Sequence, residues 1–124
     1  MSRTEDWPTW VYLLKESTED SRYLKVGFAD DLTKRVSGLQ CGNPRVLELG
    51  FALRVRRRRD AKLLEAQFLE QAARSRIYGE WIEMPLEDAT KLLITIASAA
   101  NITVLGYAPA INGSVYGQTL SPPD

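Results

Sequence analysis

The amino-acid sequence predicts one small α/β domain of the α+β type, in which helices flank a mainly antiparallel sheet of three or four strands. The length of 124 residues suits a single domain, and the apolar content of 44% is enough for one ordinary core. Segments with the two-residue period of strands alternate along the chain with segments that have helical spacing. We place the domain at residues 1–105 and expect an irregular C-terminal tail at residues 106–124.

Three segments are expected to form the centre of the sheet. Trp10–Leu14 and Tyr23–Phe28 are rich in β-branched and aromatic residues, and a polar stretch separates them, which indicates two adjacent antiparallel strands. In Val46–Val55 large apolar residues alternate with small or polar ones, which is typical of a half-buried strand.

Two helices are expected around the third strand. Asp30 or Asp31 suits the N-cap of a short helix whose apolar residues share one face: Leu32, Val36 and Leu39. This helix should end at Gly42-Asn43-Pro44. Asp60 suits the cap of a second helix that runs to about Ala73.

The remaining elements follow the break at Gly79. A short strand is expected at Glu80–Met84, and Pro85 should open a third helix that ends near Asn101. A last strand is expected at Ile102–Leu105.

The composition excludes several kinds of site. The chain has no histidine, so catalytic triads with histidine and histidine-containing metal sites are ruled out. Cys41 is the single cysteine, so no disulfide within the chain can form. No signal-like or membrane-spanning segment is evident, and we therefore expect a cytoplasmic protein with no membrane partner.

Positive charge is concentrated in one part of a chain whose net charge is zero. Residues 22–62 contain eleven basic and four acidic residues, so the rest of the chain is correspondingly acidic. The densest group has two interpretations, a solvated helix entrance or a set of phosphate contacts; it comprises Arg54, Arg56, Arg57, Arg58 and Arg59.

Glu65 is the most unusual residue of the second predicted helix, because it falls inside the apolar stripe. A carboxylate there should be paired, hydrogen-bonded, at the helix margin, or at the floor of a cleft that holds a metal. Arg35 lies at the edge of the buried face of the first predicted helix. Its guanidinium therefore either meets Glu65 or binds a ligand nearby.

These residues occur in an order that resembles the GIY-YIG nuclease superfamily, and more narrowly its short branch of phages and bacteria. The first strand carries Val11-Tyr12-Leu13, and the second carries Lys25-Val26-Gly27, which matches the K-hydrophobic-G form that the second motif takes in this branch. The pattern R-x-x-x-L-Q-x-G-N-P follows from Arg35 to Pro44, and G-E-W lies at residues 79–81. The resemblance covers about residues 9–84.

The resemblance implies a metal-dependent nuclease that cleaves a phosphodiester bond of nucleic acid, with DNA as the expected partner. Tyr12 would be a general base or position the water, Lys25 would take the place of the second-motif tyrosine, and Arg35 would stabilise the phosphate. Glu65 would hold Mg²⁺ or Mn²⁺. Asn43 and the arginine group would contact nucleic acid. We expect Tyr12, Lys25, Arg35 and Glu65 to converge on one concave surface.

A second hypothesis belongs to a different class. Leu69 stands where the branch has a histidine one turn after the glutamate. The loss of that imidazole favours a module without catalysis, which binds nucleic acid or docks to a protein partner.

Overall fold

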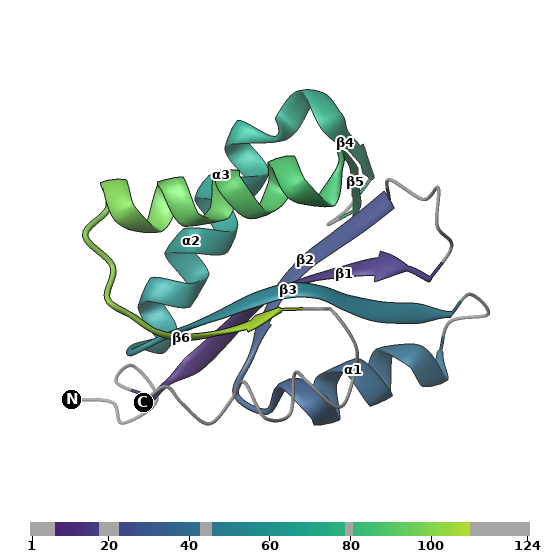
Figure 1. The fold of residues 1–124 in the computed structure, drawn as a ribbon, viewed down its shortest axis with the longest axis horizontal. Coiled ribbons are helices and arrows are strands. Elements are labelled where there is room, and N and C mark those ends of the chain that lie inside the picture. Colours follow the sequence, from purple (N-terminus) through teal and green to yellow (C-terminus); the bar gives the residue numbers. More distant parts are fainter. Residues whose placement is uncertain (1–6, 18–22, 43–45, 79–80, 110–124) are drawn as a thin grey trace.

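A six-stranded antiparallel sheet forms the centre of the protein (Figure 1). The structure is a computed structural model that describes residues 7–17, 23–42, 46–78 and 81–109. The sheet order is β4-β5-β2-β1-β3-β6. The strands are β1 (Thr9–Glu16), β2 (Tyr23–Ala29), β3 (Leu47–Val55), β4 (Arg76–Tyr78), β5 (Trp81–Glu83) and β6 (Val104–Pro109). The predicted α+β class is confirmed, with a wider sheet than expected.

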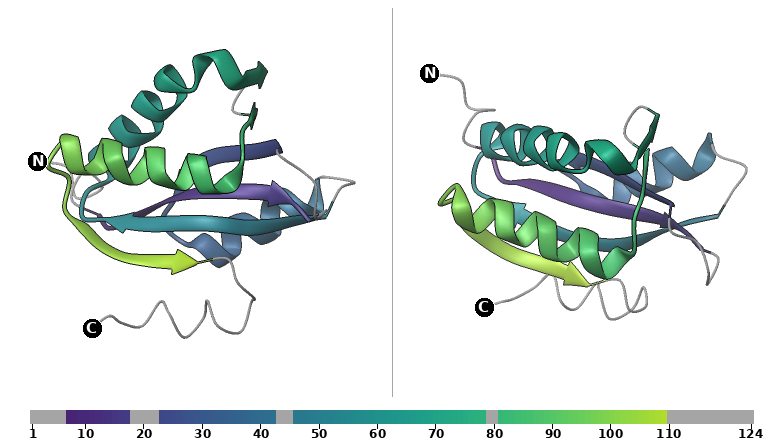
Figure 2. Two further views of the ribbon diagram at one scale, coloured as in Figure 1. Left: turned by 45° about the horizontal axis from the view of Figure 1, so that its top comes forward. Right: turned by 90° about the horizontal axis from the view of Figure 1, so that it is seen from above.

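Helices cover both faces of this sheet. The helices are α1 (Leu32–Cys41), α2 (Arg58–Gln71) and α3 (Leu86–Ala99), and a 3₁₀ turn follows α2 at Ala73–Ser75. Figures 1 and 2 show α2 and α3 together on one face and α1 on the other. We call the side that α1 covers the α1 face.

The alternation of side chains along β1 creates two separate cores. Val11 and Leu13 pack with α2 and α3, whereas the side chains of the opposite register pack on the α1 face: Trp10, Tyr12 and Leu14. Leu32 of α1 is buried in this second core, and Val36 and Leu39 pack against it, as the helical spacing predicts.

The strand β3 is buried on both sides, so the expectation of a half-buried strand was wrong. Leu49 and Ala52 face α1, while Phe51 and Leu53 face α2 and α3. Small residues allow close packing, since a Cβ on Gly50 would lie 2.7 Å from a methyl carbon of Leu86. A strand at the centre of a sheet between two helix layers needs no polar face.

Local signals located the helix ends well, with one exception. Asp31 is the N-cap of α1, where its side chain accepts a hydrogen bond from the backbone N–H of Lys34. The N-cap of α2 is Arg57, and Asp60 lies in its first turn, so the prediction of Asp60 as the cap was wrong. A carboxylate in the first turn still interacts favourably with the helix dipole.

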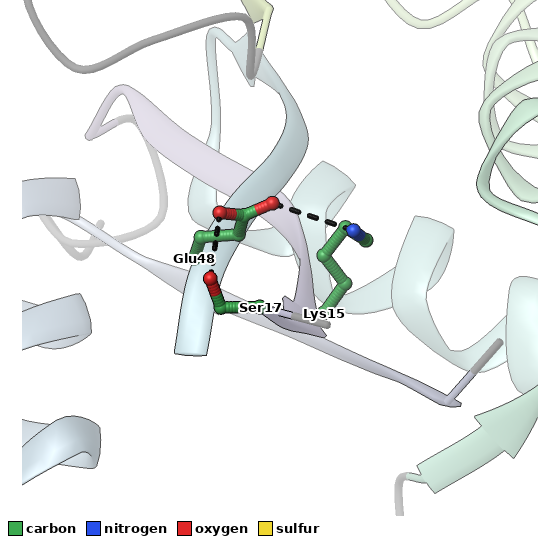
Figure 3. Close-up of polar contacts among 3 residues, drawn as sticks. All are labelled: Lys15, Ser17 and Glu48. Carbon is green, nitrogen blue, oxygen red and sulfur yellow. Dashed lines mark hydrogen bonds and ion pairs between the residues drawn. The ribbon is translucent and has the colours of Figure 1, made fainter. Parts of the chain in front are cut away.

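Polar contacts join the end of β1 to the start of β3 (Figure 3). Glu48 accepts hydrogen bonds from Lys15 Nζ at 3.3 Å and from Ser17 Oγ at 3.2 Å. The side chain of Gln40 accepts a 2.7 Å hydrogen bond from the backbone N–H of Leu47, which connects the end of α1 to β3.

The described part of the chain differs from expectation at two strands. The strand β4 carried no recognised signal, and β6 runs to Pro109, four residues past the expected end at Leu105. Residues 110–124 of the expected tail lie outside the described residues. No helix in the described ranges is both long enough and apolar enough to cross a membrane.

Candidate functional site

Tyr12 lies on the α1 face, where its ring covers the backbone of β2. Tyr12 is directly opposite Gly27 in the β1–β2 pairing and is 1% exposed. A Cβ on Gly27 would lie 2.5 Å from Cζ of the tyrosine ring, and closer still to its hydroxyl. Gly27 is therefore the residue that lets the tyrosine hydroxyl reach across β2.

Lys25 lies on the same face as Tyr12, two residues before Gly27. It pairs with Trp81 of β5, and Lys25 Nζ lies 6.0 Å from the centre of the Trp81 ring. Both side chains are partly buried. The sheet thus places an ammonium group and an indole ring beside Tyr12, and sequence reasoning had assigned no role at the site to Trp81.

Arg35 lines an open groove of about 620 Å³ along the side of α1. The groove is lined by Ala29, Asp30 and Asp31 at its β2 end, and by Lys34, Arg35, Gly38 and Leu39 of α1. Lys34 was missed by sequence reasoning, although its helical spacing from Asp31 and Gly38 places it on the same stripe as Arg35.

In this groove the acidic side chains have partners, whereas the basic side chains have no ion pair within the described residues. Asp30 pairs with Arg58 of α2 at 3.1 Å, and Asp31 caps α1 at 3.0 Å. Lys34 and Arg35 are exposed and make no ion pair within the described residues. Since both carboxylates already have partners, the groove offers two cations to an anionic ligand.

Glu65 lies midway along α2, away from this groove. The buried residues of α2 pack on the opposite face of the sheet from α1 (Figure 1). Glu65 itself is partly buried, in keeping with a position at the margin of the apolar stripe. Tyr12, Lys25 and Arg35 thus belong to the α1 face and Glu65 to the other, contrary to our expectation of one concave surface.

Glu65 lies on the unexpected face because of the path that the chain takes from β3 to α2. Helical periodicity shows which side of α2 is buried, but it does not show which face of the sheet that side covers. Arg35 and Glu65 could share a site only around the edge of β2. β5 pairs with β2 only at Tyr23, Leu24 and Lys25, so within the described residues the rest of that edge has no strand partner.

The arginine group divides into residues with different surroundings. Arg58 contacts Asp30 and lies 5.3 Å from the centre of the Phe28 ring, so it attaches α2 to the end of β2. Arg56 and Arg59 are exposed and have no ion pair among the described residues. Arg54 lies in β3 on the α1 face, over the ring of Trp10. Asn43 lies outside the described residues.

The described residues contain no group of three or more acidic or cysteine side chains that could hold a metal ion by themselves. Any metal bound there would need ligands from substrate and water, because Mg²⁺ commonly uses one or two carboxylates together with phosphate oxygens. A single carboxylate such as Glu65 fits that requirement in its chemistry.

The model of the T5orf172 domain matches residues 9–97. No curated protein and no solved structure matches the chain. The match corrects the resemblance to GIY-YIG nucleases, because the matching family is a different one. Short strand motifs and one helix-end motif are too few residues to distinguish two small nuclease-like families.

Proposed function

Because the chain belongs to the T5orf172 domain family, which is associated with nucleases and DNA binding, we propose that it binds DNA and hydrolyses phosphodiester bonds beside the open edge of β2. The observation that carries this proposal is the groove along α1. Its carboxylates are engaged by other residues, whereas Lys34 and Arg35 face solvent without an ion pair in the described part of the chain.

The groove suits a phosphate of the nucleic-acid backbone. An arginine guanidinium presents parallel N–H donors that match two phosphate oxygens, and Lys34 adds a second positive charge. Ala29 lines the groove, and it lies on the same face of β2 as Gly27 and Lys25. A phosphate bound at Arg35 would therefore lie on the same face of the sheet as the Tyr12 side chain.

We assign the chemistry to Arg35 in the groove and to Tyr12 and Lys25 on the same face of the sheet. A water oxygen gives up a proton and attacks phosphorus, the bond from phosphorus to the leaving sugar oxygen breaks, and the leaving oxygen takes up a proton. Tyr12 orients the water, Lys25 assists the proton transfer, and Arg35 stabilises the negative charge that develops on the phosphate. Tyrosine alone is a poor base at neutral pH because its reference pKa is about 10.

Glu65 is the residue proposed to hold Mg²⁺ or Mn²⁺. A bound divalent cation would lower the pKa of a coordinated water and neutralise charge on the phosphate. The helix α2 begins beside Phe28 and Asp30 at the end of β2, and the chain after it leads to β4 and β5 beside the start of β2. The helix thus runs along the length of β2, with Glu65 near its middle.

A binding module without catalysis is the second candidate, and one observation favours it. The helices that carry Arg35 and Glu65 pack on opposite faces of the sheet, so a joint site must form around an edge. Such a module would use the same groove to bind DNA or to dock an acidic protein partner.

Cleavage and binding should be measured together on duplex DNA, single-stranded DNA and RNA, each with and without Mg²⁺ or Mn²⁺. We expect Glu65→Gln to abolish metal-dependent cleavage and to leave DNA affinity nearly unchanged, because a metal carboxylate serves the transition state more than ground-state binding. Glu70→Gln is the matched control, since Glu70 is an exposed residue of the same helix. A wild-type protein that binds DNA without cutting it would support the binding module instead.

A further inference from the structure

Arg54 is a cation on the α1 face that the proposed cleavage site does not use. It lies in β3 opposite Trp10 of β1, and its guanidinium carbon is 5.8 Å from the centre of the Trp10 ring. Arg54 is partly buried, and its Nε is shielded from solvent without a hydrogen-bond acceptor. Within the described residues it makes no ion pair.

The position next to Arg54 on β6 carries no side chain. Gly106 is its direct partner in the β3–β6 pairing, so side chains at both positions point to the α1 face. A Cβ on Gly106 would have no neighbouring atom within 4 Å. The pairing also shifts register between Arg54 and Val55, and such bulges redirect side chains at sheet edges.

These features together describe a site for an anion. Because the Nε–H is shielded, an anion would be bound by the terminal N–H groups of Arg54, whose charge has no ion pair among the described residues. The Trp10 ring holds the guanidinium by a cation–π contact and leaves its N–H groups available. We propose that Arg54 binds a phosphate group, and that this is a backbone phosphate of the nucleic acid bound in the groove along α1. The second part rests on the proposed function.

The register of the sheet gives the direction of the bound strand. Ala29 of the groove, Trp10, Arg54 and Gly106 form one row across β2, β1, β3 and β6. Neighbouring strands are about 4.8 Å apart, so the backbones of Ala29 and Arg54 are separated by roughly 10 Å. A nucleic-acid strand that contacts both sites would cross the strands of the sheet instead of following them.

The first experiment tests the anion site without nucleic acid. The thermal unfolding of the full chain is followed while inorganic phosphate is added, with chloride at equal ionic strength as the reference. We expect phosphate to raise the midpoint of the wild type and of an Arg74→Gln control, and to raise that of Arg54→Gln less. Arg74 is an exposed arginine in the 3₁₀ turn. Equal shifts in all three proteins would overturn the site.

The second experiment tests its use by nucleic acid. Affinity for labelled DNA is measured by fluorescence anisotropy over a range of salt concentrations. Arg54→Gln removes the charge that would neutralise one phosphate, so it should reduce the slope of log affinity against log salt by about 0.7–0.9 and weaken binding about tenfold at low salt. Arg54→Lys, which keeps the charge, should retain most of the slope.

The outcomes separate this inference from the proposed function. DNA binding with an unchanged slope in Arg54→Gln would overturn the backbone contact and leave the groove along α1 intact. If the wild type binds no nucleic acid, the proposed function and the backbone assignment fail together. A phosphate response that depends on Arg54 would then identify a site for free phosphate alone.

Discussion

The contact between Tyr12 and Gly27 predicts that Gly27→Ala destabilises the protein. The new methyl carbon would lie 2.5 Å from Cζ and 3.0 Å from Cε1 of the tyrosine ring. Carbon atoms normally approach to about 3.5–4.0 Å, so the ring must move by roughly 1 Å within a packed core. Overpacking of this kind costs about 1–3 kcal/mol.

The backbone partly offsets this cost. Alanine in the interior of a strand is favoured over glycine by roughly 0.5–1 kcal/mol. With several ring atoms overlapped, we expect a net loss of about 2 kcal/mol. Scaling the entropy of unfolding to 124 residues converts this loss to a fall of about 8 °C in Tm, which far-UV circular dichroism can measure.

Two controls isolate the overlap as the cause. Gly106→Ala, in the same kind of backbone but with open space around its Cβ, should leave Tm unchanged or raise it. In a Tyr12→Leu background, which lacks the overlapping ring atoms, Gly27→Ala should cost less than about 0.5 kcal/mol. An equal fall in Tm with Tyr12 and with Leu at position 12 would refute the steric explanation.

The other predictions concern α1 and the start of α2. Asp31→Ala removes the hydrogen bond to the Lys34 backbone and should cost about 1 kcal/mol in urea unfolding, whereas Asp31→Asn should cost much less. Replacing both Arg56 and Arg59 by glutamine should lower the salt slope of DNA affinity by about 0.7–0.9 for each phosphate that these arginines neutralise in the wild type. If that double variant keeps the wild-type slope, the exposed arginines do not contact the substrate.

Local sequence patterns predicted every helix and strand except β4, but not how the helices are distributed over the sheet. Asp31 and the spacing of Leu32 and Leu39 defined α1, because capping and amphipathic periodicity depend on neighbouring residues only. The face that α2 covers depends on the path of the chain after β3, which no local pattern contains. For this reason the expected single surface with Glu65 differs from the structure.

The same limit applies to individual side chains. The alternation in β3 was correct as a strand signal, yet it could not show that helices cover both faces. Arg54 was singled out only as part of a basic group. Its position over Trp10 and beside Gly106 depends on pairing with two strands that lie on either side of β3, one of them about fifty residues later in the sequence.

The strand β6 has a practical consequence for work with this domain. It lies beyond residues 9–97, yet it pairs with β3 from Phe51 to Val55 and contributes the buried Ala108 to the core under α1. A truncated chain that ended with α3 at Ala99 would leave β3 as an edge strand with unpaired backbone groups and apolar side chains. Such edges promote aggregation between molecules. An expression fragment should therefore extend at least to Pro109, since the boundary of the matched region is not a safe place to cut.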